Sequence, residues 1–247
     1  MSFWGITSKN AGQKAAMQAL LNDKPFTFLT GPAGCGKTLI SQAVGLHEVV
    51  ESQRFQKLIY TRLQTQVGAD VGADIGALPG DINEKTYPFI APFLDNFELL
   101  SGKDSLEYLV MGDEKKRKVF FDPIQTVRGR SMHYTFLMTD EAQNLDPTTI
   151  GAIATRIAKE YDGRISSKFV FLGNFSQTDS PKLRRPENNG LYQLLNGLYE
   201  REAFEYFDHI NLTEVERHPV VNIVEDILRN HDMDDRFAEL EERGTVK

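Results

Sequence analysis

The stretch GPAGCGKT, residues 31–38, constrains the fold of this chain more than any other feature of the sequence. It follows an apolar run at 26–30 and precedes a segment with helical periodicity. Backbone N–H groups that turn inward around phosphate oxygens require glycine, because a Cβ atom would intrude on the anion. The helix that follows directs the positive end of its dipole at the same phosphates. The pattern therefore predicts a strand, a phosphate-binding loop and a helix in succession.

Every residue of this stretch is expected to contact a nucleotide. Lys37, which we also count as catalytic, is expected to reach the β and γ phosphates, and the Thr38 hydroxyl to ligate Mg²⁺. The backbone of the remaining residues is expected to hold the phosphates: Gly31, Pro32, Ala33, Gly34, Cys35 and Gly36. An ordinary turn at a helix start is the alternative, and it is disfavoured because strand, loop and helix occur in the required order. ATP and Mg²⁺ are therefore the expected ligands.

A pair of carboxylates follows a second apolar strand, in YTFLMTDEAQN at 134–144. Asp140 is expected to hold Mg²⁺, since hard cations prefer oxygen ligands. Glu141 is expected to act as general base or to position the water that attacks the γ-phosphate. Helix capping by Asp140 is the alternative, but Asp146, which precedes Pro147, is the better cap.

A third strand runs into GNFSQTD, residues 173–179. Side chains at the carboxyl end of a buried strand face the crevice in which open α/β sheets bind ligands. Asn174 and Gln177 are therefore candidates to contact the γ-phosphate or to orient the attacking water. An ordinary polar turn explains this segment equally well.

Short β-rich runs alternate with helical stretches along the chain, which favours an α/β fold with a mostly parallel sheet and helices on both faces. The predicted strands are 26–30, 57–61, 118–121, 135–139, 168–172 and 205–212. The predicted helices are 38–51, 83–100, 147–160, 190–199 and 220–230. We expect one domain over 1–230 and a charge-rich peripheral helix or frayed tail over 231–247.

Composition narrows the class of protein. The net charge of −7 does not favour a nucleic-acid binder, although a local basic surface can coexist with an acidic exterior. The single cysteine, Cys35, allows no internal disulfide and fits a reducing compartment. No signal peptide and no apolar run long enough for a membrane span are visible, so a cytoplasmic protein without a membrane partner is expected.

Together these segments resemble the PhoH family of P-loop ATPases, and the resemblance covers nearly the whole chain. RGRS followed by DEAQN is more specific than the phosphate-binding loop alone. The landmarks occur in family order: NAGQ at 10–13, GPAGCGKT at 31–38, TR at 61–62, LPGDINEK at 78–85, RGRS at 128–131, DEAQN at 140–144, TR at 155–156, SQTDSP at 176–181, NGL at 189–191 and ER at 216–217.

The resemblance implies a RecA-like fold similar to the first motor domain of superfamily 1 helicases. It also implies ATP hydrolysis, and often a hexameric ring. Asn10 and Gln13 resemble an adenine-reading motif, although Asn10 as a helix N-cap is an equal alternative. Gln143 resembles a helicase residue that links the γ-phosphate to polynucleotide.

The chain departs from the family pattern in three places. Cys35 stands where threonine is usual, which a loop that binds through its backbone tolerates. Asn174 replaces an aspartate, so a carboxylate beside the γ-phosphate is absent. Leu63 replaces the proline of a family TRP motif.

A lone motor domain has no second domain to complete its ATP site, so the cation that reaches the γ-phosphate is expected to come from a neighbouring subunit. Arg217, which we count as catalytic, is the first choice and Arg156 the second, with a closed ring of six as the expected assembly. The other candidates are Arg62, Arg128 and Arg130.

Three other segments have a structural and a functional interpretation. The glycine-containing connection at 62–81 is of a length that is usually functional or disordered. The spacing of Phe89, Phe93 and Phe97 is more typical of the core or of a subunit interface than of a surface that stacks on bases. The basic run 115–118 favours a solvated face over nucleic-acid contact.

Two functions from different classes remain open. In the first, ATP hydrolysis remodels RNA or single-stranded DNA through a ring. In the second, the chain is a nucleotide-dependent switch or assembly module that acts on a protein.

Overall fold

The computed structural model describes residues 2–63, 82–101, 109, 117–127, 132–159, 165–218, 220–228 and 234–246. A six-stranded sheet with the order β5-β4-β6-β7-β3-β8 forms its centre, and every neighbouring pair is parallel. Its strands are β3 Phe26–Thr30, β4 Lys57–Arg62, β5 Val119–Phe121, β6 Thr135–Asp140, β7 Ser167–Leu172 and β8 Phe207–Asn211. A separate two-stranded hairpin consists of β1 Ser2–Phe3 and β2 Ile6–Thr7. The predicted mostly parallel sheet is confirmed.

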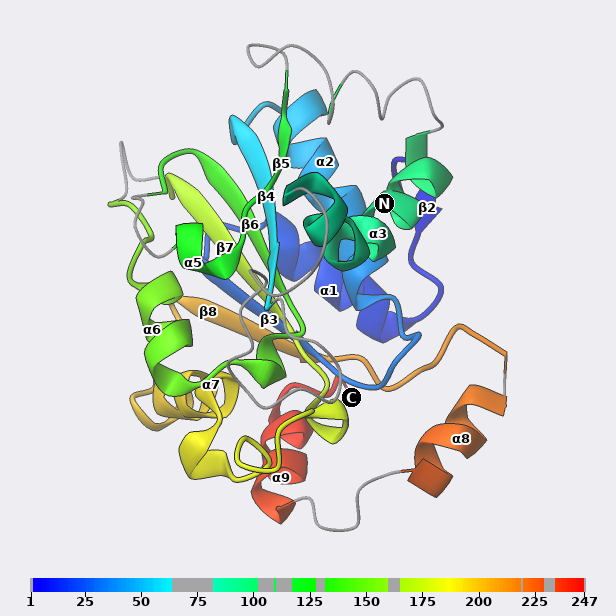
Figure 1. Cartoon of the computed structure of the whole chain (residues 1–247), viewed down its shortest axis with the longest axis vertical. Coiled ribbons are helices and arrows are strands. Elements are labelled where there is room, and N and C mark those ends of the chain that lie inside the picture. The colour runs from blue at the N-terminus through cyan, green and yellow to red at the C-terminus, as the bar shows by residue number, and fades with distance from the viewer. Residues whose placement is uncertain are drawn as a thin grey trace.

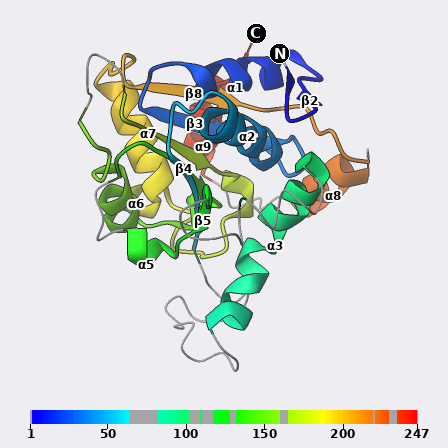
Figure 2. The same cartoon turned by 90° about the horizontal axis from the view of Figure 1, so that it is seen from above.

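Helices cover both faces of the sheet, as Figures 1 and 2 show. One face packs against α1 Ala11–Leu21, α2 Lys37–Leu46 and α3 Ile82–Ser101. The other packs against α5 Ile124–Val127, α6 Pro147–Ala154, α7 Gly190–Glu200 and α9 Asp235–Arg243. β6 and β7 are buried at every position, as expected for strands between two helical layers. No helix in the described part of the chain combines the length and apolar character that a membrane span requires.

Several elements differ from the sequence prediction, which also omitted the hairpin β1–β2 and α5. The predicted helix 147–160 ends at Ala154, because the Arg156 carbonyl accepts a hydrogen bond from the Met132 amide and Ile157 pairs with Met132. Residue 160 lies outside the described residues. The helix α1, which the sequence prediction omitted, is rich in alanine and lacks a strong apolar stripe.

The described part of the predicted segment 231–247 contains a helix, α9 Asp235–Arg243. Phe237 and Leu240 of α9 are buried, and Phe237 packs against Phe175 and Tyr192. By contrast, α8 Val220–Leu228 exposes four apolar residues at helical spacing: Val220, Ile223, Val224 and Ile227.

Some sequence-based interpretations fall outside the described residues. These are Arg128, Arg130, residues 64–81, Lys115, Lys116 and the side chain of Phe89. Phe93 and Phe97 are described, and both are fully buried beneath the sheet, which confirms their assignment to the core.

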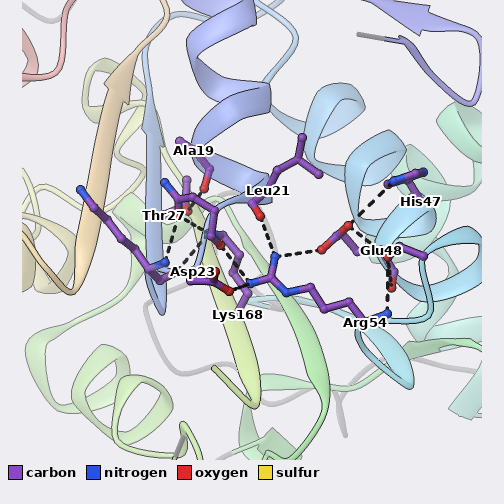
Figure 3. A network of polar contacts seen from close by, with 11 residues as sticks. Ala19, Leu21, Asp23, Thr27, His47, Glu48, Arg54 and Lys168 are labelled. Carbon is purple, nitrogen blue, oxygen red and sulfur yellow. Dashed lines mark hydrogen bonds and ion pairs between the residues drawn. The ribbon is translucent and has the colours of Figure 1, made fainter. Parts of the chain in front are cut away.

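A polar network lies at the amino-terminal edge of the sheet (Figure 3). The Arg54 guanidinium donates to the carbonyls of Leu21 and Asn22 and forms ion pairs with Asp23 and with the buried Glu48. Arg54 thus ties the turn after α1 to the π-helical turn His47–Glu51 that follows α2.

Lys168 of β7 closes the same network from inside the sheet. Its ammonium group donates to the Asn22 carbonyl, the Asn22 side chain and the Lys24 carbonyl at 3.0–3.1 Å. The side chain is fully buried, and burial together with the Arg54 guanidinium lowers the pKa of Lys168 to about 7.

Candidate nucleotide site

The loop between β3 and α2 has the backbone conformation that its glycines predict. Gly31 has a φ of +126° and Gly34 a φ of +78°, values that other residues rarely adopt. A Cβ atom on Gly34 would lie 2.7 Å from Cδ of Arg217, and one on Gly31 would overlap the Leu212 carbonyl. The segment that follows β8 therefore packs against the phosphate-binding loop, and the backbone of the loop needs glycine at both positions.

Lys37 begins α2 and folds back over this loop. Its Nζ donates to the carbonyl oxygens of Gly31 at 2.7 Å and Pro32 at 2.8 Å, and lies 3.5 Å from the sulfur of the buried Cys35. The side chain is half-buried. The ammonium group is thus held on the concave side of the loop, beside the N-terminus of α2.

The start of α1 is attached to the same loop. The Asn10 side chain caps α1 by accepting the Gln13 amide at 2.8 Å, and it donates to Glu216 at 2.8 Å. The Gln13 side chain is buried, accepts the Lys9 amide and donates to the Cys35 carbonyl at 3.2 Å. The N-cap interpretation of Asn10 is confirmed, and Gln13 lies against the phosphate-binding loop.

Asp140 ends β6 with its carboxylate almost fully buried. One oxygen, Oδ2, accepts the Tyr60 hydroxyl at 2.8 Å, and the other, Oδ1, accepts the Glu141 amide at 3.0 Å. Burial and the neighbouring Glu141 carboxylate raise the pKa of Asp140, while the Tyr60 hydrogen bond and Arg62 oppose that rise. The carboxylate is therefore fixed in orientation, and each oxygen retains capacity to accept a further ligand.

Glu141 adopts a left-handed backbone conformation with a φ of +51°. A non-glycine residue rarely has this conformation, and such strain collects at functional sites. Its Oε2 accepts the Gln143 side chain at 2.6 Å, and its Oε1 lies 3.8 Å from the Arg62 guanidinium. About a third of the Glu141 side chain stays exposed. The carboxylate is held between two donors and still reaches solvent.

Gln143 connects the end of β6 to the end of β7. Its Oε1 accepts the Asn174 amide at 3.1 Å, and its Nε2 also donates to the Gln177 carbonyl at 3.3 Å. Its own carbonyl accepts the Asn189 side chain at the start of α7. Glu141, Gln143, Asn174 and Gln177 thus lie in one hydrogen-bonded group, Gln177 through its backbone.

The Asn174 side chain has one occupied and one unoccupied end. Its Oδ1 accepts the backbone amide and the hydroxyl of Ser176. Its buried Nδ2 has no hydrogen-bond partner among the described residues. A buried amide without a partner is costly, so this donor is suited to an incoming acceptor.

The sheet topology explains why these groups meet. β7 lies between β3 and β6, so the three segments that follow these parallel strands leave from one edge of the sheet. The connection after β3 enters α2 on one face, and the connection after β7 leads to α7 on the other. Open α/β sheets bind ligands where connections diverge in this way.

The candidate arginines are distributed over the fold. The aliphatic part of Arg217 lies over Gly34 of its own chain. Among the described residues, Arg217 forms no ion pair with Glu214. Arg156 instead donates to the Ala152 carbonyl at the amino-terminal edge, away from the loop of its own chain.

Sequence reasoning missed one group at the site, the Tyr60 hydroxyl. Tyrosine in an apolar strand is typical of a core residue, and only the pairing of β4 with β6 brings its hydroxyl to Asp140. The signal available in the sequence was the position of Tyr60, two residues before Arg62 near the end of a strand.

The donor set fits Mg²⁺ and a polyphosphate. Mg²⁺ takes one or two protein oxygens together with phosphate oxygens and water. The Asp140 carboxylate and the Thr38 hydroxyl in the first turn of α2 are such oxygens. A glycine cradle with the N-terminus of α2 fits the phosphates. No cluster of three histidine, cysteine or acidic residues suited to a metal occurs in the described residues.

Comparison with known proteins agrees with this geometry. The model of the family described as PhoH-like protein matches residues 5–229. Protein PhoH2 of Bacillus subtilis is 34% identical over 192 residues, which are 76% of this chain and 40% of that protein. A PhoH-like protein of Synechocystis is 30% identical over 217 residues, which are 87% of this chain and 60% of that protein.

One solved structure of similar fold is the large terminase from a thermophilic bacteriophage. The TM-score is 0.53 at 12% identity, over 91% of this chain and 52% of that chain. This likeness concerns the fold alone, a RecA-like P-loop sheet with helices on both faces. The chain spans about 40–60% of the length of the two curated relatives. Since the family model extends over most of its residues, the chain belongs to the PhoH-like protein family.

Proposed function

We propose that this chain is a Mg²⁺-dependent ATP hydrolase. The observation that carries the proposal is the convergence of a glycine cradle, Lys37 and the Asp140–Glu141 pair at one edge of the sheet. Family membership supports nucleotide-dependent activity in general.

The residues divide the work of hydrolysis as follows. Lys37 leaves the Gly31 and Pro32 carbonyls to neutralise the β and γ phosphates, and the loop amides hold them. Asp140 and Thr38 would hold Mg²⁺, which would supply positive charge to the polyphosphate. Glu141 orients the attacking water and accepts its proton.

Two further donors complete the proposed site. The side-chain amide of Asn174 donates to a γ-phosphate oxygen or to the attacking water. The aspartate that is usual at this position in the family cannot donate in this way. Arg217 extends its guanidinium from Gly34 toward charge that develops on the phosphate.

Phosphate release by purified Lys37→Ala tests the proposal. We expect the variant to lose hydrolysis and keep its unfolding transition, because a half-buried lysine at a loop adds little packing. Lys159→Ala, at an exposed position, is the matched control and should retain full activity. Wild-type turnover in folded Lys37→Ala would overturn the assignment.

We propose in addition that hydrolysis is coupled to RNA or single-stranded DNA in a ring of subunits. Gln143 supports this coupling, because its side chain donates to Glu141 and its carbonyl accepts the side chain of Asn189. Asn189 lies at the end of a segment in which two cations, Lys182 and Arg185, are exposed. Cations on such a surface contact nucleic-acid phosphates. The alternative is a nucleotide-dependent switch that acts on a protein.

Stimulation of phosphate release separates these two functions. For polynucleotide coupling, single-stranded RNA or DNA should raise the rate of the wild type, and added salt should diminish the effect. Lys182→Ala combined with Arg185→Ala should lose stimulation and keep the basal rate. An unchanged rate at saturating polynucleotide would favour the protein switch. Mass measurement at working concentration tests the expected hexamer.

A further inference from the structure

The pairing of β4 with β6 places Tyr60 on the sheet face that carries Asp140. Tyr60 lies opposite Met138 and Arg62 opposite Asp140, so Tyr60 stands two residues short of the carboxyl edge. Side chains of paired residues in neighbouring strands point to the same face, and alternate residues share that face. The long tyrosine side chain therefore spans the distance to the edge that a shorter residue would leave open.

Packing fixes the direction of the Tyr60 ring. The ring centroid lies 4.9 Å from that of Phe93 and 6.2 Å from that of Phe121, and the residue is almost fully buried. A buried phenol must find a hydrogen-bond acceptor or lose free energy. The acceptor here is Oδ2 of Asp140 at 2.8 Å.

The remaining oxygen of Asp140 is held just as closely. Oδ1 accepts the amide of Glu141, whose left-handed backbone brings that amide within 3.0 Å. Two donors on two oxygens define the plane of the carboxylate. Removal of the phenol would leave only the backbone donor, about which the carboxylate can rotate.

We propose that Tyr60 is the positioning residue for Asp140 and sets the affinity of this site for a divalent cation. The inference rests on the proposed function, in which Asp140 is the magnesium ligand. Groups that orient a metal ligand from outside typically change metal affinity or activity by about ten- to a hundredfold when they are removed. In this proposal Tyr60 acts on the cation by holding Asp140 and is assigned no contact with the reacting atoms.

Tyr60→Phe removes the hydroxyl and keeps the ring between Phe93 and Phe121. The matched control is Tyr199→Phe, which removes the phenol of a half-buried tyrosine, bonded to His209 at 3.1 Å on the far side of the sheet. Asp140→Asn serves as the reference for direct loss of the ligand. ADP binding without metal shows that each variant retains a folded phosphate-binding loop.

The decisive measurement is Mn²⁺ affinity, read from the electron paramagnetic resonance of free Mn²⁺ in the presence of a non-hydrolysable ATP analogue. We expect Tyr60→Phe to bind Mn²⁺ at least about tenfold more weakly than the wild type, and Tyr199→Phe to bind normally. The Mg²⁺ concentration for half-maximal hydrolysis should rise by a similar factor, with kcat largely recovered at saturating Mg²⁺. A role in packing alone would not move this requirement.

The variants separate the two levels of the proposal. If Asp140→Asn loses Mn²⁺ while Tyr60→Phe binds it like the wild type, the positioning role of Tyr60 is overturned and the metal site stands. If Asp140→Asn also binds Mn²⁺ normally, the metal site of the proposed function fails, and the role of Tyr60 fails with it.

Discussion

The two edges of the central sheet both carry clusters of charged and amide side chains, but these clusters bond to different partners. At the amino edge, Arg54 and Lys168 donate to backbone carbonyls of the turn between α1 and β3. At the carboxyl edge, the Gln143 side chain donates to Glu141 and accepts the backbone amide of Asn174, and the Asn174 side chain keeps a buried donor without a described partner.

This difference indicates what each edge does. At the amino edge, Arg54 and Lys168 stabilise the fold, because the carbonyls of the turn would otherwise be buried without donors. The half-buried Lys37 at the carboxyl edge also donates to two carbonyls, those of Gly31 and Pro32, but in the proposed function it leaves them for a phosphate. Side chains that hold one another leave acceptors and donors for a ligand. We therefore expect substitutions at the carboxyl edge to change activity and substitutions at the amino edge to change stability.

The largest expected effect belongs to Glu141→Gln. The amide keeps the size of the side chain but cannot accept the proton of water, so the rate should fall by about a hundredfold or more. ATP affinity should persist, because Asp140 and Lys37 are unchanged. Single-turnover hydrolysis and nucleotide binding provide the check. Loss of Mg²⁺-dependent ATP binding by Glu141→Gln would mean that the two carboxylate roles are reversed.

Arg54→Met should reduce the free energy of unfolding by about 3 kcal/mol, because it removes the guanidinium from the buried Glu48 and takes a donor from the Leu21 and Asn22 carbonyls, of which Asn22 keeps Lys168. Chemical denaturation measures this loss. The hydrolysis rate per folded molecule should stay normal. Arg201→Met, at an exposed position, is the control and should be close to neutral. A stable but inactive Arg54→Met would contradict the assignment of stability to the amino edge and of hydrolysis to the carboxyl edge.

Arg217→Ala should slow hydrolysis by about tenfold, the effect of losing one hydrogen bond to a charged group. Because Arg217 lies over the loop of its own chain, a mixture of Arg217→Ala and Lys37→Ala subunits should stay at the sum of their separate rates. Recovery in exchanging mixtures would show that a neighbour supplies the arginine. The same mixture with Arg156→Ala examines the second candidate.

Lys168→Met provides the smallest and most specific effect, a change in pH dependence. The folded pKa of about 7 lies below the ordinary value of 10.5, so between these pH values the unfolded chain holds a proton that the folded chain has released. The stability of the wild type relative to Lys168→Met should therefore rise with pH above about 7, by at most about 1.4 kcal/mol per pH unit. A difference that is constant between pH 7 and 9 would contradict this assignment.

The strands and the phosphate-binding loop could be predicted because their signals are local. The apolar run 26–30 coincides with β3, and the glycines of 31–36 determine their own backbone conformation. Asp140 and Glu141 could be placed at a strand end because the strand before them is apolar almost throughout.

The rest depends on contacts between distant segments. The burial of Lys168 could not be predicted, since lysine is almost never fully buried without partners, and its partners lie in the turn at 22–24. The contact of Arg217 with Gly34 likewise arises only when the segment after β8 crosses the loop after β3. Sequence reasoning singled out Arg217 but not its neighbour Gly34, and it gave Lys168 no role.

The central claim is that hydrolysis resides at the carboxyl edge and stability at the amino edge of the same sheet. Its most direct test measures phosphate release and denaturant unfolding on Lys37→Ala and Arg54→Met side by side. The account predicts that Lys37→Ala loses hydrolysis with an unchanged unfolding midpoint, and that Arg54→Met unfolds at lower denaturant with a normal rate per folded molecule. If Lys37→Ala hydrolyses ATP normally, or if Arg54→Met is fully stable and inactive, the account is contradicted.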